Sequence, residues 1–344
     1  MRPSHTQNRA AYLLLLPTLL LLAVVIGYPI IAALIHSFQA DPGLDPATGL
    51  FVNGGFAGFD NYLHWLLQRC AGPDGTYISC PDGNLASNFY ASVGITFFFA
   101  VATVSLELVF GMWMAIIMNR NFRGRGLVRA AILVPWAIPT AVSAKLAYFI
   151  FAPTGIVNAI TGTETLWTTA QWASRAAIII TDTWKTTPFM ALLILAGLQL
   201  IPEEVYEAAK MDGTTTVQRF MSITLPLARP ALIVAILFRT LDALRMYDLP
   251  AIFNGGGGGS GHATTTLSIL VVNQVKQGYN SASALSTITF LIIFLVAIVF
   301  IRFLGADITG TGRVSRRQAR RDRREQEELA RLEASEPQLQ EVGA

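Results

Sequence analysis

The sequence predicts an all-α, polytopic membrane protein with six transmembrane helices. Hydrophobic residues make up 53% of the 344 residues and charged residues only 14%, whereas roughly a quarter of a soluble domain is charged. The charges are also clustered, and long stretches between the clusters contain none. The apolar residues are therefore expected to form separate segments and not one globular core.

Six stretches are apolar over the roughly 20 residues that a spanning helix needs. They are residues 10–38, 89–118, 127–151, 173–200, 231–249 and 282–304. The first could be read as a cleaved signal peptide, because Arg2 and Arg9 precede it, but its apolar run exceeds the roughly 7–15 residues of such a peptide. We therefore expect a short N-terminal segment (1–9), a six-span domain (10–304) and a tail (305–344).

The distribution of Lys and Arg sets the expected orientation, since cytoplasmic segments are enriched in both. With the N-terminus inside, the outside loops contain little more than Arg69, Arg175 and Lys276. The inside segments then contain Arg120, Arg123, Arg125, Arg129, Lys210, Arg219, Arg229 and the arginine-rich tail. We expect both termini to be cytoplasmic, and the tail to be solvated or to rest on anionic lipid.

The loop 39–87 is the largest predicted outside segment and is expected to fold as a small cap. It contains Cys70 and Cys80, which face an oxidising compartment and can form a disulfide; two free thiols are the alternative. The two cysteines lack the spacing of a metal site. The sequence thus indicates no metal, no cofactor and no nucleic-acid partner.

The glycine-rich run 254–266 is compatible with a flexible linker. It lacks the Lys-Ser or Lys-Thr that follows the glycines of a nucleotide-binding loop, and His262 stands nearby instead. The chain therefore shows no nucleotide motif of its own.

A polar insertion, residues 202–229, separates the fourth and fifth spans. One helix is expected to start at Pro202 and to end near Gly213, where glycine can adopt the left-handed conformation. A second is expected to run from a cap at Thr214 to Pro226. The insertion could dock on another protein or pack against the ends of its own spans, and the pattern alone favours neither.

The insertion contains a spaced motif: Glu207-Ala208-Ala209, three residues, Gly213, nine residues, Ile223, one residue, Leu225-Pro226. This motif resembles, without a gap, the EAA signature of the permease subunits of ATP-binding-cassette importers. The resemblance extends over residues 10–305, and within that family the sequence is similar to the sugar permeases of the maltose, trehalose and glycerol-phosphate group. The longer glycine run and the arginine-rich tail depart from that pattern.

The resemblance implies a type I importer permease fold and a coupling role for the insertion, which in that family docks in a cleft of the ATPase subunit. It implies that Glu207 contacts the ATPase, that Ala208 and Ala209 form a close-packing ledge, that Gly213 is the bend, and that Leu225 and Pro226 anchor the next span. The implied partners are a second permease in a heterodimer, an ATPase dimer and an extracytoplasmic solute-binding protein. The implied substrate is a sugar, for example trehalose or maltose, and the implied location is the bacterial cytoplasmic (inner) membrane.

Ionisable residues inside the predicted spans indicate either structural pairs or a polar route, because an unpaired charge in a bilayer is costly. We expect Asp182 to pair with Lys185, Glu107 to approach Lys145, and the set Arg239, Asp242, Arg245 and Asp248 to alternate in sign along the fifth span. The alternative is a substrate pathway lined by Thr183, Trp184, Thr187, Asp242 and Arg245. Hydrogen-bonding groups of this kind suit hydroxyl-rich solutes.

Two other functional classes are less compatible with the sequence. A membrane enzyme needs clustered catalytic groups, yet the four histidines are scattered over predicted ends and outside loops, so we expect no catalytic residues. An ion-coupled secondary carrier could use the same intramembrane charges, but it would not explain the coupling motif.

Overall fold

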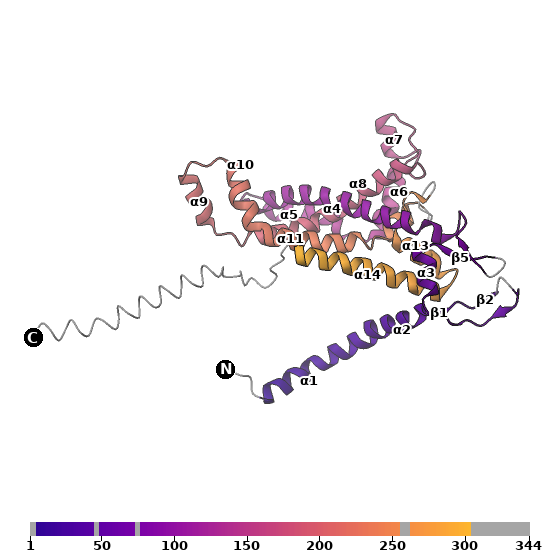
Figure 1. Cartoon of the computed structure of the whole chain (residues 1–344). Coiled ribbons are helices and arrows are strands. Elements are labelled where there is room, and N and C mark those ends of the chain that lie inside the picture. Colours follow the sequence, from indigo (N-terminus) through magenta and orange to yellow (C-terminus); the bar gives the residue numbers. More distant parts are fainter. Residues whose placement is uncertain (1–4, 45–47, 73–75, 255–261, 304–344) are drawn as a thin grey trace, which may run out of the picture.

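The structure, a computed structural model, describes residues 5–44, 48–72, 76–254 and 262–303 (Figure 1). The expected tail 305–344 and most of the glycine-rich run lie outside the described residues.

Long helices dominate the described chain, and they coincide closely with the predicted spans. Five of them, or six when one bent pair counts as a single span, are long and apolar enough to cross a membrane. They are formed by α1 (His5–Leu22), η1 (Ala23–Gly27) and α2 (Tyr28–Ser37) in series, α4 (Phe89–Asn119), the bent pair α5 (Arg125–Ala137) and α6 (Thr140–Ile150), α8 (Gln171–Leu198), α11 (Leu225–Ala243) and α14 (Tyr279–Phe303).

The third predicted span is broken. Its two halves, α5 and α6, meet at an angle of 87°. The break falls at Ile138 and Pro139, both in extended conformation, because a residue before proline disfavours the helical region and proline lacks the N–H that would continue the helix. This break opens space beside α8.

The fifth span also differs from the prediction, because α11 ends at Ala243 and not near Leu249. A turn follows, and the short helix α12 (Asp248–Phe253) then packs against α6. Consequently Arg245 and Asp248 do not continue the helix of Arg239, and the expected alternating ladder along one helix is wrong.

The cap between α2 and α4 contains short strands that an all-α prediction does not include. They form three antiparallel pairs. The elements are β1 (Gln39–Ala40) with β4 (Gly55–Phe56), β2 (Gly43–Leu44) with β3 (Phe51–Val52), β5 (Arg69–Ala71) with β6 (Tyr77–Ser79), and the helices α3 (Asp60–Leu66) and η2 (Leu85–Asn88).

The cap is tied to the last span through Asp41. Its carboxylate accepts hydrogen bonds from the backbone N–H groups of Asn280 (2.6 Å) and Ser281 (2.9 Å), at the positive end of the α14 dipole. The Trp65 indole, fully buried, donates to the Ser281 carbonyl at 3.1 Å. Cap and bundle therefore form one packed unit at this end.

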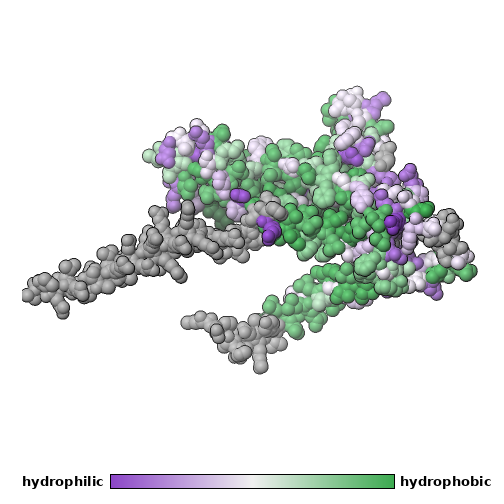
Figure 2. Space-filling view, viewed as in Figure 1, coloured by the Kyte–Doolittle hydropathy of each residue, from purple (hydrophilic) through white to green (hydrophobic). Residues whose placement is uncertain are grey.

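Hydrophilic residues gather at two opposite ends of the bundle, and hydrophobic residues cover its long sides (Figure 2). One end contains the cap, α7 (Ile156–Thr161) and α13 (Leu267–Val275); the other contains α9 (Glu203–Met211), α10 (Thr216–Arg219) and η3 (Phe220–Thr224) (Figure 1). α2 packs against α14, whereas α1 stands off from the bundle. This distribution is typical of a membrane-spanning bundle whose two polar ends face water.

The core lies where α4, α8 and α11 pack together. Glycine permits close approach at two points: a Cβ added at Gly111 of α4 would lie 2.9 Å from Met190 Cγ of α8, and one at Gly197 of α8 would overlap Ala231 of α11. Small residues at such contacts let helix backbones pack closely in a membrane. These three helices hold the charged residues described next.

Candidate functional site

Arg239 is the centre of a buried charge cluster within the helix bundle. The residue is 2% exposed, and its guanidinium binds both oxygens of Glu107 on α4, Nε to Oε2 at 2.5 Å and Nη2 to Oε1 at 2.9 Å. The same Nη2 also donates to Asp182 on α8, and Nη1 donates to Asp242 at 2.8 Å. One cation thus joins three helices.

This arrangement suits arginine in particular. The planar guanidinium can bind a carboxylate with two parallel hydrogen bonds and still offer donors to other groups. Arg239 binds both carboxylate oxygens of the fully buried Glu107, and the Thr186 hydroxyl adds a further hydrogen bond to Oε1 at 2.6 Å. Each charged group of a buried ion cluster needs partners of this kind, because burying an unpaired charge costs free energy.

Two expected pairs do not form. Glu107 pairs with Arg239 and not with Lys145, because α4 packs against α8 and α11 while α6 packs against α8 and α12. Lys145 lies exposed on α6, with its ammonium 5.9 Å from the Tyr148 ring centroid. Likewise Asp182 pairs with Arg239, and Lys185 takes part in no ion pair among the described residues.

A polar cavity of about 290 Å³ opens beside this cluster. Its wall includes the middle of α8, the end of α11, the turn after it and the break between α5 and α6. The charged residues on the wall are Asp182, Lys185, Arg239, Asp242, Arg245 and Asp248, and they are accompanied by Thr140, Thr186, Trp136 and Tyr247. Donors and acceptors of hydrogen bonds therefore surround one space inside the membrane-spanning part.

The structure brings only part of the predicted pathway together. Asp242 and Arg245 line the polar cavity, but Trp184 lines a separate, apolar cavity of about 250 Å³ between α6 and α8. Thr183 and Thr187 are buried, and Thr187 donates to the Thr183 carbonyl at 2.5 Å. The reason is the 3.6-residue helical period, which puts neighbours in sequence on different faces of α8.

The insertion, unlike the buried charge cluster, is an exposed element at one end of the bundle. Its first helix, α9, ends in a Schellman motif: Gly213 has φ +73° and donates to the Lys210 carbonyl at 3.0 Å, and Thr214 donates to the Ala209 carbonyl at 3.2 Å. Glu207 and Ala208 are exposed, whereas Ala209 is 6% exposed. The bend expected at Gly213 is present.

The second helix of the insertion differs from the prediction. Its cap is Thr215 and not Thr214, in a capping box with Gln218. Pro226 does not close it: α10 passes through η3, a π-helix, directly into α11, and Pro226 occupies the first turn of α11. Proline lacks the N–H that would bond back to the preceding turn, and the π-helical turn η3 lies directly before it, where the regular ladder of helical hydrogen bonds is already altered.

A groove of about 750 Å³ runs between α9, α10 and the end of α4. Tyr206 links its two sides, with its hydroxyl 3.2 Å from Thr224 Oγ1. Apolar side chains at this end are unusually exposed, with Met211 at 88% and Val217 at 68%. Arg120, Lys210 and Arg219 add positive charge along the groove.

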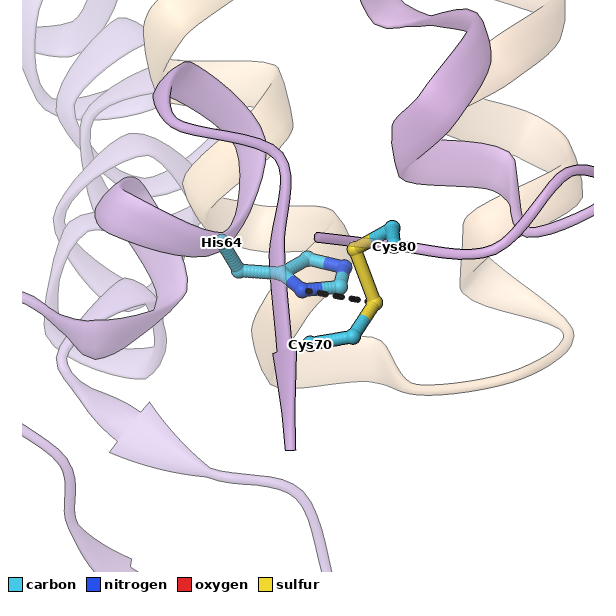
Figure 3. A group of neighbouring side chains, drawn as sticks. All are labelled: His64, Cys70 and Cys80. Atoms are coloured by element: carbon cyan, nitrogen blue, oxygen red, sulfur yellow. Dashed lines mark hydrogen bonds between the residues drawn. A yellow bond between two sulfur atoms is a disulfide. The ribbon is translucent and has the colours of Figure 1, made fainter. Parts of the chain in front are cut away.

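His64 and the cap cysteines form a third cluster, shown in Figure 3. Their ligand-type atoms lie within 4.8 Å of one another, but Cys70 and Cys80 are joined in a disulfide, and a metal needs the thiolate form. His64 Nδ1 lies 2.7 Å from the Arg69 carbonyl. Burial lowers the pKa of His64 below its ordinary value of 6.5, and the hydrogen bond to Arg69 opposes this effect. The cluster therefore stabilises the β5–β6 hairpin.

Sequence reasoning missed two contacts that organise the fold, the Arg239–Glu107 pair and the Asp41 cap of α14. The first has a sequence signal, since both residues are ionisable and lie in apolar runs. The second has none that we recognise, because Asp41 is one of several aspartates in a polar loop.

The described chain is a multi-span helical membrane protein with a charged internal cavity and an exposed polar element at one end. The chain belongs to the family described as the binding-protein-dependent transport system inner membrane component, which matches residues 107–309. The matched region contains both the charge cluster and the insertion. The chain is accordingly a multi-pass permease subunit and not an enzyme.

Relatives support this membership, and a solved structure shares the fold. The chain is 37% identical to the trehalose/maltose transport system permease protein MalF of Thermococcus litoralis, over 87% of this chain and 94% of that protein. It is 33% identical to the trehalose transport system permease protein SugA of Mycobacterium tuberculosis, over 88% and 91%. A chain in a bacterial ABC transporter involved in the import of the acidic polysaccharide alginate shares the fold, with a TM-score of 0.68 and 18% identity over 87% of this chain and 96% of that one.

Proposed function

We propose that this chain is the transmembrane permease subunit of an ATP-driven carbohydrate importer, and that it forms half of the translocation pathway. The observation that carries the proposal is the 37% identity to the Thermococcus litoralis trehalose/maltose permease over 87% of the chain. That alignment spans most of the bundle. A disaccharide such as trehalose or maltose is the proposed substrate, in line with the names of both relatives.

The insertion is proposed to couple the bundle to a separate ATPase subunit. Glu207, Ala208 and Gly213 are exposed at the end of the bundle, as a docking element requires. The uninterrupted helical path from α10 through η3 into α11 supplies a stiff arm. Arg239 lies 14 residues beyond Leu225 on that arm, or ~21 Å at a rise of about 1.5 Å per residue. A push on the insertion would therefore reach the charge cluster through one helix.

Leu225 and Pro226 are proposed to anchor this arm at the start of α11. Leu225 is partly buried and packs against the core cluster, whereas Pro226 fixes the backbone of the first helical turn. Ala209, the buried residue of α9, is proposed as part of the small-residue ledge that allows close packing of the insertion.

The remaining parts of the proposal concern the surroundings of the chain. A second permease is proposed to complete the pathway as a heterodimer, an ATPase dimer to dock at the insertion, and an extracytoplasmic solute-binding protein to meet the cap. The excess of Lys and Arg at the α9 end supports placing that end, and both termini, in the cytoplasm of a bacterial cell. The cap would then face outward.

The substitution Glu207→Lys tests the coupling role in a complex with the partner subunits. Because Glu207 is exposed, the reversal is expected to leave the permease folded but to lower ATP-driven uptake of trehalose or maltose at least roughly tenfold, a change worth about 1.4 kcal/mol. Glu164→Lys, an equally exposed reversal near α7 at the other end, is the matched control and should transport normally.

Normal uptake by an assembled Glu207→Lys complex would refute the docking role. Uptake that follows the membrane potential while ATP is maintained would refute the ATP-driven proposal in favour of an ion-coupled carrier.

A further inference from the structure

Lys185 stands out within the polar cavity because its ammonium makes no ion-pair contact among the described residues, although its charge interacts with that of Asp182 at longer range. The residue is 8% exposed and lines the cavity. Among the described residues it forms no hydrogen bond and no ion pair, and the nearest acid on its own helix, Asp182, binds Arg239. An unpaired ammonium inside a membrane-spanning bundle is costly, and such residues mark functional positions.

The rest of the cavity wall shows which ligand this ammonium fits. Within the described part of the chain, Arg245 is the other cation of the cavity wall without a carboxylate contact, and its Nε donates to the Leu241 carbonyl at 3.3 Å. Asp248 has no ion pair among the described residues, and Asp242 is bound to Arg239 through one oxygen only. The cavity therefore offers unused donors and unused acceptors side by side.

The balance of charge argues against an anionic ligand. The wall contains three carboxylates and three cations, and Glu107 adds a fourth carboxylate directly behind Arg239. An acidic solute would meet like charge that has no further cation to offset it. A neutral, hydroxyl-rich solute can accept from Lys185 and donate to Asp242 or Asp248 at once.

We propose that Lys185 is a specificity-determining residue whose ammonium donates hydrogen bonds to hydroxyl oxygens of an uncharged sugar in this cavity. Arg239 makes this possible, because it neutralises Asp182 and leaves Lys185 available. The inference rests on the proposed sugar import and adds to it the charge class of the substrate and the residue that selects it.

The test uses the complete complex in vesicles and measures the amount of trehalose or maltose moved per ATP hydrolysed. Lys185→Met removes the donor and keeps the chain length, and it is expected to lower this ratio roughly ten- to hundredfold, the effect of losing one hydrogen bond from a charged group. Lys185→Arg should restore most of the ratio. Lys145→Met, on the exposed face of α6 outside the cavity, is the control and should match the wild type.

The outcomes separate this inference from the proposed function. A wild-type complex that moves neither sugar refutes the proposed substrate, whereas a wild-type complex that works alongside an unimpaired Lys185→Met refutes the role of Lys185. Lys185→Gln serves as a second neutral variant: loss of assembly in both neutral variants would assign Lys185 to structure and overturn the proposal. Uptake of the uronic acid counterpart at the rate of the neutral sugar would overturn the charge class.

Discussion

Arg239 shows how a single residue can organise the interior of a membrane bundle. Its guanidinium holds Glu107 and Asp182, two acids that would otherwise stand unpaired in adjacent helices. Replacing a whole buried ion cluster by apolar residues can be neutral for stability, but removing one partner leaves uncompensated charge. The stability of the bundle is therefore expected to depend on the balance of the cluster more than on any one member.

Arg239→Met is expected to destabilise the protein by about 3–5 kcal/mol, because two buried carboxylates lose their counter-charge. The thermal midpoint of the purified protein in detergent measures the effect. Arg245→Met is the control, since Arg245 is exposed and contacts no carboxylate of the described residues, and it should change the midpoint little.

The double variant Arg239→Met with Glu107→Gln should recover part of the lost stability, since it removes one of the orphaned charges. A midpoint for Arg239→Met equal to that of the wild type would show that the cluster contributes nothing to stability.

At the scale of elements, close packing of α4, α8 and α11 positions the charged residues. Gly111 and Gly197 lie where neighbouring helices approach closely. Without a hydrophobic driving force between helices in lipid, such contacts depend on van der Waals packing between small residues. The packing of α4 on α8 and of α8 on α11 thus decides whether Glu107 of α4 can reach Arg239 of α11.

Gly111→Val is expected to destabilise the bundle by roughly 1–3 kcal/mol, the usual cost of overpacking, because a Cβ there would meet Met190 at 2.9 Å. Gly94→Val places the same side chain on the same helix where nothing lies within 4 Å, so it controls for the change in helix propensity. Thermal midpoints of the two variants provide the comparison, and equal values would mean that α4 and α8 do not require close contact at Gly111.

The sequence predicts most of these elements, and it does so for physical reasons that also define its limits. Transmembrane spans can be predicted because each is a local apolar run of residues. The helices α4 and α8 accordingly agree with their predicted ranges within a few residues. The break at Pro139, the early end of α11 and the course of η3 depend on contacts between elements. The pairing of charged residues is likewise non-local. Glu107 and Arg239 lie 132 residues apart, and neither apolar run contains a signal that identifies the other residue as the partner.

For the insertion, local chemistry was again the better guide. Gly213 is a positive-φ position and ends α9, as its sequence context predicts. The adjacent threonines Thr214 and Thr215 are equally good caps by type, but Gln218 stands three residues after Thr215, which is the spacing of a capping box, so the sequence did contain the signal that selects Thr215. Proline at position 226 is compatible both with ending a helix and with beginning one, so its role required the structure.

At the scale of the whole molecule, the chain is a bundle with two unlike ends. The cap end is fixed to α14 through Asp41, and the other end presents the exposed insertion. The charged cavity lies on the span residues between them. This layout fits our proposal that mechanical work enters at the insertion and solute enters at the cap, provided that the insertion faces the cytoplasm.

The side of the membrane on which the insertion lies can be measured directly by labelling single cysteines with a membrane-impermeant maleimide. Cys70 and Cys80 are joined in a disulfide and should not react, so Glu207→Cys and Glu164→Cys can each be made in the natural chain. Our account predicts that Glu164→Cys labels in intact spheroplasts, and that Glu207→Cys labels only after the membrane is opened. Labelling of Glu207→Cys in intact spheroplasts at the rate of Glu164→Cys would contradict the coupling role of the insertion.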